Sequence, residues 1–375
     1  MDTDVLKNLT DPAVLFFFLG LVIGLIRSNL EIPPAIAKFL SLYLLMALGF
    51  KGGQALSDAG VGGDAVKVLV AAMLLALVIP AVWFGVLRRR INAFDAAAIA
   101  ATYGSVSAVT FVTASQFVAG RGDPAGGYLT VALVIMESPA IIMAVLLATW
   151  VRSRAATAGG TGTRDVEDAP ATIGLASIDA GTLVPEAAHR SGQRGPDERG
   201  ADEAGHAAPG APPSIKEVLR EAFTDGAHLL LIGSLVVGAV SGEAGGRAME
   251  PFTSGIFKGL LAFFLLEMGL LVARQLREVR DVGSFLIGFG LVVPFVNGAA
   301  AMALGSLLGL GVGDLTLLAV LAASGSYIVV PAVVRYAIPE ARPSRYFTLA
   351  LGITFPVNVA IGIPLYYAVA RALAG

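Results

Sequence analysis

Two short stretches at related positions decide the fold. They read Gly104-Ser105-Val106-Ser107 and Ser324-Gly325-Ser326-Tyr327. The first interrupts the apolar segment at residues 96–119, and the second interrupts the one at residues 315–334. Glycine destabilises a helix by about 1 kcal/mol relative to alanine, and serine hydroxyls compete for backbone hydrogen bonds. We therefore expect both segments to be helices that break at these stretches.

Apolar segments of this kind recur along the whole chain. Of its 375 residues, 56% are hydrophobic and only 14% are charged, and the mean hydropathy is +0.77. Soluble domains are about 25% charged, so the composition indicates a protein that lies in lipid. A membrane-spanning helix needs about 20 mostly apolar residues. We expect an all-α integral membrane protein with ten spans, at residues 13–26, 35–50, 66–87, 96–119, 128–151, 228–240, 257–273, 285–308, 315–334 and 346–370.

The two halves of the chain resemble each other. Polar residues recur at a constant spacing of 219 residues, with Asp95, Ser105 and Ser107 matching Asp314, Ser324 and Ser326. Each half contains five expected spans, an odd number, so the second copy enters the membrane from the opposite face. Inverted repeats of this kind are typical of secondary transporters. The sequence therefore predicts two inverted five-helix repeats in which spans four and nine are broken.

The segment between the halves has a different composition. Residues 153–213 are rich in Ala, Gly, Pro, Thr and charged residues, and such a segment buries too little apolar surface to become ordered. Three domains follow: a first five-helix repeat at residues 1–152, a disordered cytoplasmic linker at 153–213, and a second repeat at 214–375 that opens with an amphipathic helix. The chain has no cysteine, which excludes disulfides and thiolate metal sites.

Basic residues in the short loops predict the orientation. They follow spans three, five, seven and nine, and the positive-inside rule puts such loops in the cytoplasm. The residues concerned are Arg88, Arg89, Arg90, Arg152, Arg154, Arg274, Arg277, Arg280, Arg335, Arg342 and Arg345. With ten spans, both termini are then periplasmic, and the protein belongs in the inner membrane.

The paired breaks indicate a site for a small anion. If both helices unwind, the half-helices that follow present free N–H groups and a partial positive charge near the middle of the membrane. Two such ends can bind an anion without any basic residue. We expect the substrate to contact the eight residues of the two breaks: Gly104, Ser105, Val106, Ser107, Ser324, Gly325, Ser326 and Tyr327.

One carboxylate lies inside an expected span. Glu137 precedes Ser138-Pro139 in span five, and an intramembrane carboxylate is costly enough to suggest a role in transport. We predict a site for a coupling cation or a proton at Glu137, with Thr110, Thr354 and Asn358 as further ligands. His228 borders span six, and we expect it at the membrane interface.

Three aspartates stand near expected helix starts. Asp11 followed by Pro12 predicts an N-cap and a first-turn proline for the first helix. For Asp95 and Asp314 we also expect capping roles.

The pattern as a whole resembles the SbtA-type sodium-dependent bicarbonate transporters. The likeness rests on Glu31-Ile32-Pro33, Leu48-Gly49, Gly52-Gly53, Gly104, Val106-Ser107, an acidic residue before Ser138-Pro139-Ala140, Ala322-Ala323-Ser324, Ser326, Arg335 and Ala337-Ile338-Pro339. The resemblance implies a sodium symporter of bicarbonate, a homotrimer with a mobile substrate-carrying core, no cofactor besides the coupling sodium ion, and regulation by a PII-like protein on the cytoplasmic side. This chain has Tyr327 where the family has an acidic residue.

Two other classes stay open at this point. A carrier of another small anion or carboxylate would share every feature except Tyr327 and its neighbours. A channel would need a continuous polar stripe, whereas the polar residues here cluster at the breaks. An enzyme is not expected, because no histidine lies firmly inside a span to activate a hydroxyl nucleophile.

Overall fold

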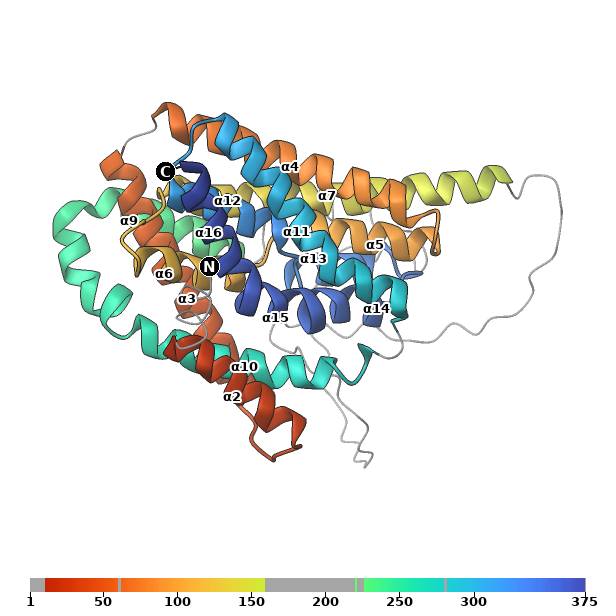
Figure 1. The fold of residues 1–375 in the computed structure, drawn as a ribbon, viewed down its shortest axis with the longest axis horizontal. Helices are drawn as coiled ribbons and strands as arrows, with labels where there is room; N and C mark the ends of the chain where they lie inside the picture. The colour runs from red at the N-terminus through yellow and green to blue at the C-terminus, as the bar shows by residue number, and fades with distance from the viewer. Residues whose placement is uncertain (1–10, 60–61, 159–219, 221–225, 280–281, 375) are drawn as a thin grey trace, which may run out of the picture.

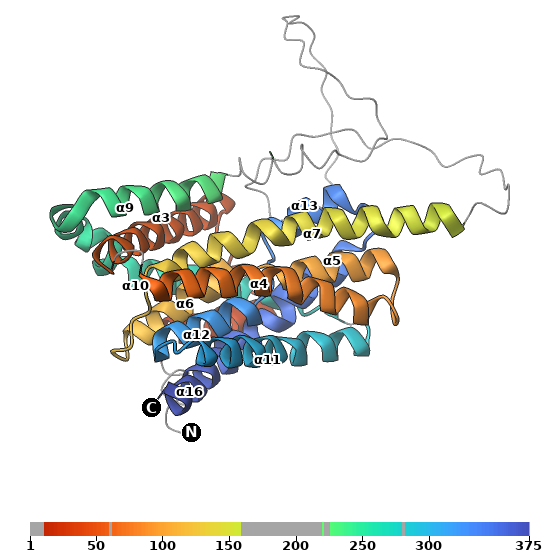
Figure 2. The same cartoon turned by 90° about the horizontal axis from the view of Figure 1, so that it is seen from above.

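The structure is a computed structural model, and it describes residues 11–59, 62–158, 220, 226–279 and 282–374. Within these ranges the regular structure is helical, without a strand (Figures 1 and 2). The helices of the first half are α2 (Pro12–Leu25), α3 (Pro34–Ala59), α4 (Gly63–Leu87), α5 (Ala93–Gly104), α6 (Ala108–Ala119) and α7 (Tyr128–Ala158). Most of the expected linker and the amphipathic helix after it lie outside the described residues, while residues 153–158 continue α7.

The second half is also helical, with several π-helical turns. Its elements are α9 (Gly226–Glu250), η1 (Pro251–Gly255), α10 (Phe257–Gln275), α11 (Ser284–Leu307), α12 (Val312–Ala323), α13 (Val329–Ala337), α14 (Pro343–Phe347), η3 (Thr348–Thr354), α15 (Phe355–Val357), η4 (Asn358–Gly362) and α16 (Ile363–Ala374). The expected all-α class is therefore correct for the described part of the chain.

Seven helical segments among the described residues are long and apolar enough to cross a membrane. One of them, Gly226–Gln275, runs for 50 residues and covers two of the ten expected spans. Its helix bends at Gly242, whose φ of 59° is readily adopted by glycine. Two more expected spans fall on helices that are too short to be counted, α2 with 14 residues and α12 with 12. The chain is thus a multi-pass membrane protein.

The start of the first helix is as the sequence predicts. Asp11 is the N-cap of α2, and its Oδ1 accepts a hydrogen bond from the backbone N–H of Ala13 at 2.9 Å. Pro12 occupies the first helical position, where a backbone N–H would have no partner within the helix, so its absence costs no hydrogen bond.

The helices form two groups. In the four-helix group, α2 packs along α10 and α3 packs along α9 (Figures 1 and 2). In the larger group, α4 packs on α5 and α7, and α12 packs on α11, α6 and α16. The groups meet where α3 contacts α6 and α7 and where α10 contacts η3.

Glycines allow the close packing inside the four-helix group. A Cβ at Gly49 of α3 would lie 2.6 Å from the Leu231 carbonyl oxygen of α9, and a Cβ at Gly269 of α10 would lie 2.2 Å from the Phe17 carbonyl oxygen of α2. Only glycine permits such backbone contact, as in other small-residue helix interfaces. Gly49 and Gly269 are also matching residues of the two halves, so each half contributes one equivalent contact.

The capping roles expected for Asp95 and Asp314 are wrong. The N-cap of α5 is Asn92, and that of α12 is Gly311. Both aspartates instead join the two halves. Asp95 accepts hydrogen bonds from the Arg342 backbone N–H and from Nη1 of Arg345, each at 2.8 Å. Asp314 accepts one from the Gly126 backbone N–H at 2.8 Å and another from the Tyr128 hydroxyl.

The Asp95 contact makes a testable contribution to stability. Asp95→Ala leaves the partly buried Arg345 guanidinium without its carboxylate, and removing one member of a buried pair destabilises a protein by about 3–5 kcal/mol. We expect the melting temperature of the purified protein in detergent to fall by several degrees. The matched control is Asp64→Ala, which breaks an exposed pair with Lys67 and should leave the melting temperature unchanged. Equal melting temperatures for the two variants would contradict this role of Asp95.

Candidate functional site

The first break lies between α5 and α6. The α-helix α5 ends at Gly104, Ser105 is extended, and α6 begins at Ala108. Ser107 is the N-cap of α6, and its Oγ accepts hydrogen bonds from the backbone N–H of Thr110 at 3.2 Å and from the Thr110 hydroxyl at 2.9 Å. Gly104 lies against Pro80 of α4, where a Cβ would come within 2.6 Å of the proline ring. The small residue at this position lets the end of α5 approach α4.

The second break has a similar local structure. The helix α12 ends at Ala323, and α13 begins at Val329. The Oγ of Ser326 accepts a hydrogen bond from the backbone N–H of Val330 in the first turn of α13, at 3.2 Å. The carbonyl oxygen of Ala323 accepts one from Nδ2 of Asn358 at 2.9 Å. Side chains thus satisfy backbone groups that a helix end leaves unpaired.

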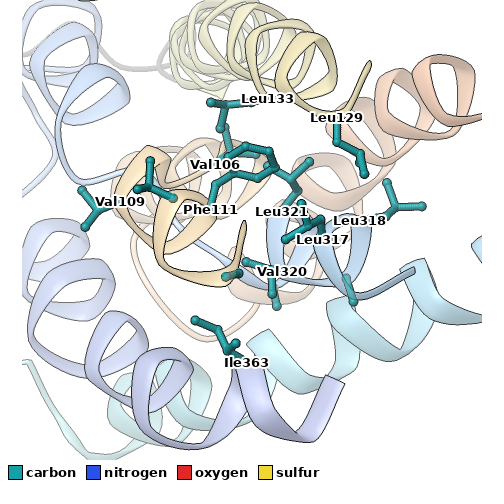
Figure 3. Packing of buried hydrophobic residues seen from close by; sticks show 14 of the residues in the cluster. Val106, Val109, Phe111, Leu129, Leu133, Leu317, Leu318, Val320, Leu321 and Ile363 are labelled. Carbon is teal, nitrogen blue, oxygen red and sulfur yellow. The ribbon is translucent and has the colours of Figure 1, made fainter. Parts of the chain in front are cut away.

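Hydrogen bonds join the two breaks to each other. The backbone N–H of Ser107 donates to Oγ of Ser324 at 3.1 Å, and the backbone N–H of Ser326 donates to the carbonyl oxygen of Thr102 at 2.9 Å. Apolar packing surrounds the junction. Figure 3 shows Val106 and Phe111 close to Leu321 of α12. The breaks therefore form one buried structure made from both halves.

A cavity of about 70 Å³ lies where α6 and α13 begin. A water molecule needs roughly 10–15 Å³ by the same measure, so the cavity can hold several waters or one small anion. Residues of both helix groups line it: Ser41, Leu44, Leu45, Val106, Ser107, Ala108, Val109, Val112, Leu133, Glu137, Ala227, His228, Leu231, Phe264, Ser326, Tyr327, Ile328 and Val329. No lysine or arginine is among these residues, which include Glu137 and His228, and the N-termini of α6 and α13 bring partial positive charge to the cavity.

Four of the eight residues predicted for the anion site line this cavity. They are Val106, Ser107, Ser326 and Tyr327. The other four, Gly104, Ser105, Ser324 and Gly325, are buried beside it and shape the breaks. The buried Tyr327 hydroxyl lies near Ser107 but has no hydrogen bond of good geometry among the described residues. It could donate to a bound anion.

Glu137 also lines the cavity, and its partner is His228. The Oε2 of Glu137 lies 2.6 Å from Nε2 of His228, and the two side chains are 12% and 7% exposed. His228, which was expected at the membrane interface, is therefore buried inside the protein against α7. One feature of the sequence is consistent with a buried position, since His228 stands at the start of an apolar segment. Its contact with Glu137 depends on how α7 and α9 are placed.

Of the other three residues predicted for the coupling cation, Thr110 lies close to the cavity, and Thr354 and Asn358 do not line it. Thr110 contacts Ser107 at the first break and is close to the cavity. Thr354 donates to the carbonyl oxygen of Gly290 at 2.9 Å and contacts the Tyr103 hydroxyl. Asn358 holds the end of α12, as described above. Neither Thr354 nor Asn358 is among the residues that line the cavity.

A family model described as the Na+-dependent bicarbonate transporter superfamily matches residues 12–371, nearly the whole chain. No curated protein matches the chain.

Proposed function

The chain belongs to the Na+-dependent bicarbonate transporter superfamily, and from this premise we propose that it is a sodium-coupled bicarbonate symporter. The observation that carries the proposal is the position of the cavity. It lies at the first turns of both α6 and α13, and hydroxyl-bearing residues line it. Bicarbonate is small, planar and negatively charged, and helix N-termini with hydroxyl groups suit such an anion.

In the proposed site each group has a defined role. The partial positive charge of the N-termini of α6 and α13 attracts the negative charge, and the hydroxyls of Ser107, Ser326 and Tyr327 form hydrogen bonds with the oxygens. Glu137, with Thr110 beside Ser107, binds the coupling sodium ion close to the anion. Thr354 and Asn358 belong to the same proposal but act farther away, where Asn358 holds the end of α12.

The proposed transport mechanism is alternating access by an elevator-like movement. Ten crossings in two inverted repeats are proposed, with the breaks in the fourth and ninth. The matched contacts of Gly49 and Gly269 support the inverted repeat, because each connects one half to the other in the same way. The separation into two helix groups supports a movement of the larger group, which contains both breaks, past the four-helix group.

The proposed orientation puts both termini in the periplasm of a cell with an inner membrane. Contacts between residues near the expected cytoplasmic ends of the spans support it. Arg345 pairs with Asp95 and Arg152 pairs with Glu340, so segments that are expected to be cytoplasmic lie together. The hydrogen bond from Arg152 also lowers the pKa of Glu340 below its usual range. A homotrimer and a PII-like regulatory partner are further proposals, and both rest on the family resemblance alone.

Transport by the purified protein tests the function. Reconstituted into liposomes, it is expected to take up labelled bicarbonate when an inward sodium gradient is imposed, and an equal potassium gradient should give only background uptake. Unlabelled formate and acetate, added in excess, test for a carrier of other carboxylates. Uptake that is the same in sodium and potassium would contradict sodium coupling, and uptake that formate abolishes would contradict bicarbonate as the preferred substrate.

A further inference from the structure

The contact between Glu137 and His228 joins the two helix groups. Glu137 lies on α7 of the larger group, and His228 lies in the first turn of α9 in the four-helix group. The two side chains approach to 2.6 Å, both are largely buried, and both line the cavity. A polar contact of this kind, in a low-dielectric site, is strong while it is made and costly when one partner is left alone.

The equivalent place in the other half can be found from the packing of the glycines. Gly49 faces the Leu231 carbonyl and the Leu235 N–H, while Gly269 faces the Phe17 carbonyl and the Leu21 N–H. Residues of α9 therefore correspond to residues of α2 at a spacing of 214. By this spacing His228 corresponds to the buried residue Val14.

Glu137 has an apolar counterpart as well. Tyr128 at the start of α7 matches Tyr346, a spacing of 218, so Glu137 corresponds to Phe355. The ring of Phe355 packs edge-on against Phe17, which lies on α2 three residues after Val14, with 5.6 Å between ring centroids. The boundary between the helix groups thus has an apolar contact at one of the two related places and a polar contact at the other.

We propose that the contact between Glu137 and His228 is a latch, which holds the two helix groups together at the cavity in this conformation and opens in each transport cycle. The inference rests on the proposed function in one respect, the movement of the groups past each other. His228 is a positioning residue in this account, because it acts on the cavity through Glu137 and the placement of α9. At the corresponding boundary in the other half the contact of Phe355 with Phe17 is apolar, so the latch has no polar counterpart there.

Accessibility of a single thiol in the cavity tests the latch. The chain has no cysteine, so Ser41→Cys on α3 introduces one reporter that lines the cavity. The labelling rate of this thiol by a bulky water-soluble maleimide is measured on the purified protein. His228→Ala in this background should raise the rate at least about tenfold, because it removes the buried polar contact that holds the two helix groups together at the cavity.

A double-variant cycle and a control make the result specific. Glu137→Ala and the Glu137→Ala/His228→Ala double variant should each label as fast as His228→Ala, because all three lack the same contact. Ser234→Ala, another buried position on α9 that does not line the cavity, should leave the rate unchanged. An unchanged rate in His228→Ala, equal acceleration by Ser234→Ala, or effects that multiply in the double variant would each overturn the latch.

The labelling assay involves no transport, so its outcome is separate from that of the proposed function. Loss of sodium-driven uptake in the wild-type protein would contradict the symporter without changing the labelling rates. Elution of each variant from a size-exclusion column at the wild-type volume shows that faster labelling does not come from unfolding.

Discussion

Leucine in place of Ser107 or Ser326 is expected to abolish bicarbonate uptake. Both serines line the cavity of about 70 Å³, and their side chains are only 4% and 2% exposed. A leucine side chain at either position extends into the volume that the anion must occupy, and it also removes the hydroxyl that caps the following half-helix. Binding and transport should therefore fall to background, which is measured as uptake per amount of protein in the membrane.

Substitutions that keep the volume should have a much smaller effect. Ser107→Ala or Ser326→Ala removes one neutral hydrogen bond with the anion, worth about 0.5–1.5 kcal/mol, so the KM should rise only several-fold. Ser115→Leu is the matched control, because Ser115 lies on α6 outside the cavity and its hydroxyl donates to the Phe111 carbonyl oxygen within the helix. If the serines serve packing alone, Ser107→Leu will lower the protein level while the surviving protein keeps normal specific activity, and that result would refute the site.

Glu137→Gln is expected to remove the dependence of transport on sodium. The substitution keeps the size of the side chain and an oxygen that can accept from His228, but it removes the negative charge that would bind a cation. Transport should fail or become independent of the sodium gradient, while binding of bicarbonate falls far less. The measurement is the initial rate of uptake as a function of external sodium, with bicarbonate binding determined separately by calorimetry.

The contact with His228 and a matched control make Glu137→Gln informative. The latch contact can persist in this variant, so a change in sodium dependence reports on the cation site itself. Glu340→Gln is the control, since Glu340 is a partly exposed carboxylate that pairs with Arg152, and neither residue lines the cavity. A sodium dependence in Glu137→Gln equal to that of the wild type would show that the coupling cation binds elsewhere.

The sequence predicted the features that depend on local chemistry. The N-cap at Asp11 could be predicted because it depends only on two adjacent residues, a capping carboxylate and the proline that follows it. The helical class and the position of most apolar segments follow from composition and length, because about 20 apolar residues suffice to identify a span. The stretches rich in Gly and Ser at residues 104–107 and 324–327 lie where α5 and α12 end.

Features that depend on the packing of distant segments were missed. Asp95 and Arg342 are 247 residues apart in the chain, so their contact leaves no trace in a local pattern, and capping was the simpler interpretation. His228 was expected at the interface because it borders span six, and its contact with Glu137 of α7 is likewise absent from any local pattern. Which four of the eight break residues face the cavity depends on the rotation of α6 and α13, and the periodicity of a broken helix does not determine that rotation.

Protection of a thiol by the substrate tests the central claim most directly. In the cysteine-free chain, Ser326→Cys puts a single thiol at the wall of the cavity, next to the first turn of α13. Ser115→Cys is the control outside the cavity. We expect bicarbonate, in the presence of sodium, to slow maleimide labelling of Ser326→Cys several-fold and to leave Ser115→Cys unaffected. An unchanged labelling rate of Ser326→Cys at bicarbonate concentrations that saturate uptake would contradict an anion site at the starts of α6 and α13.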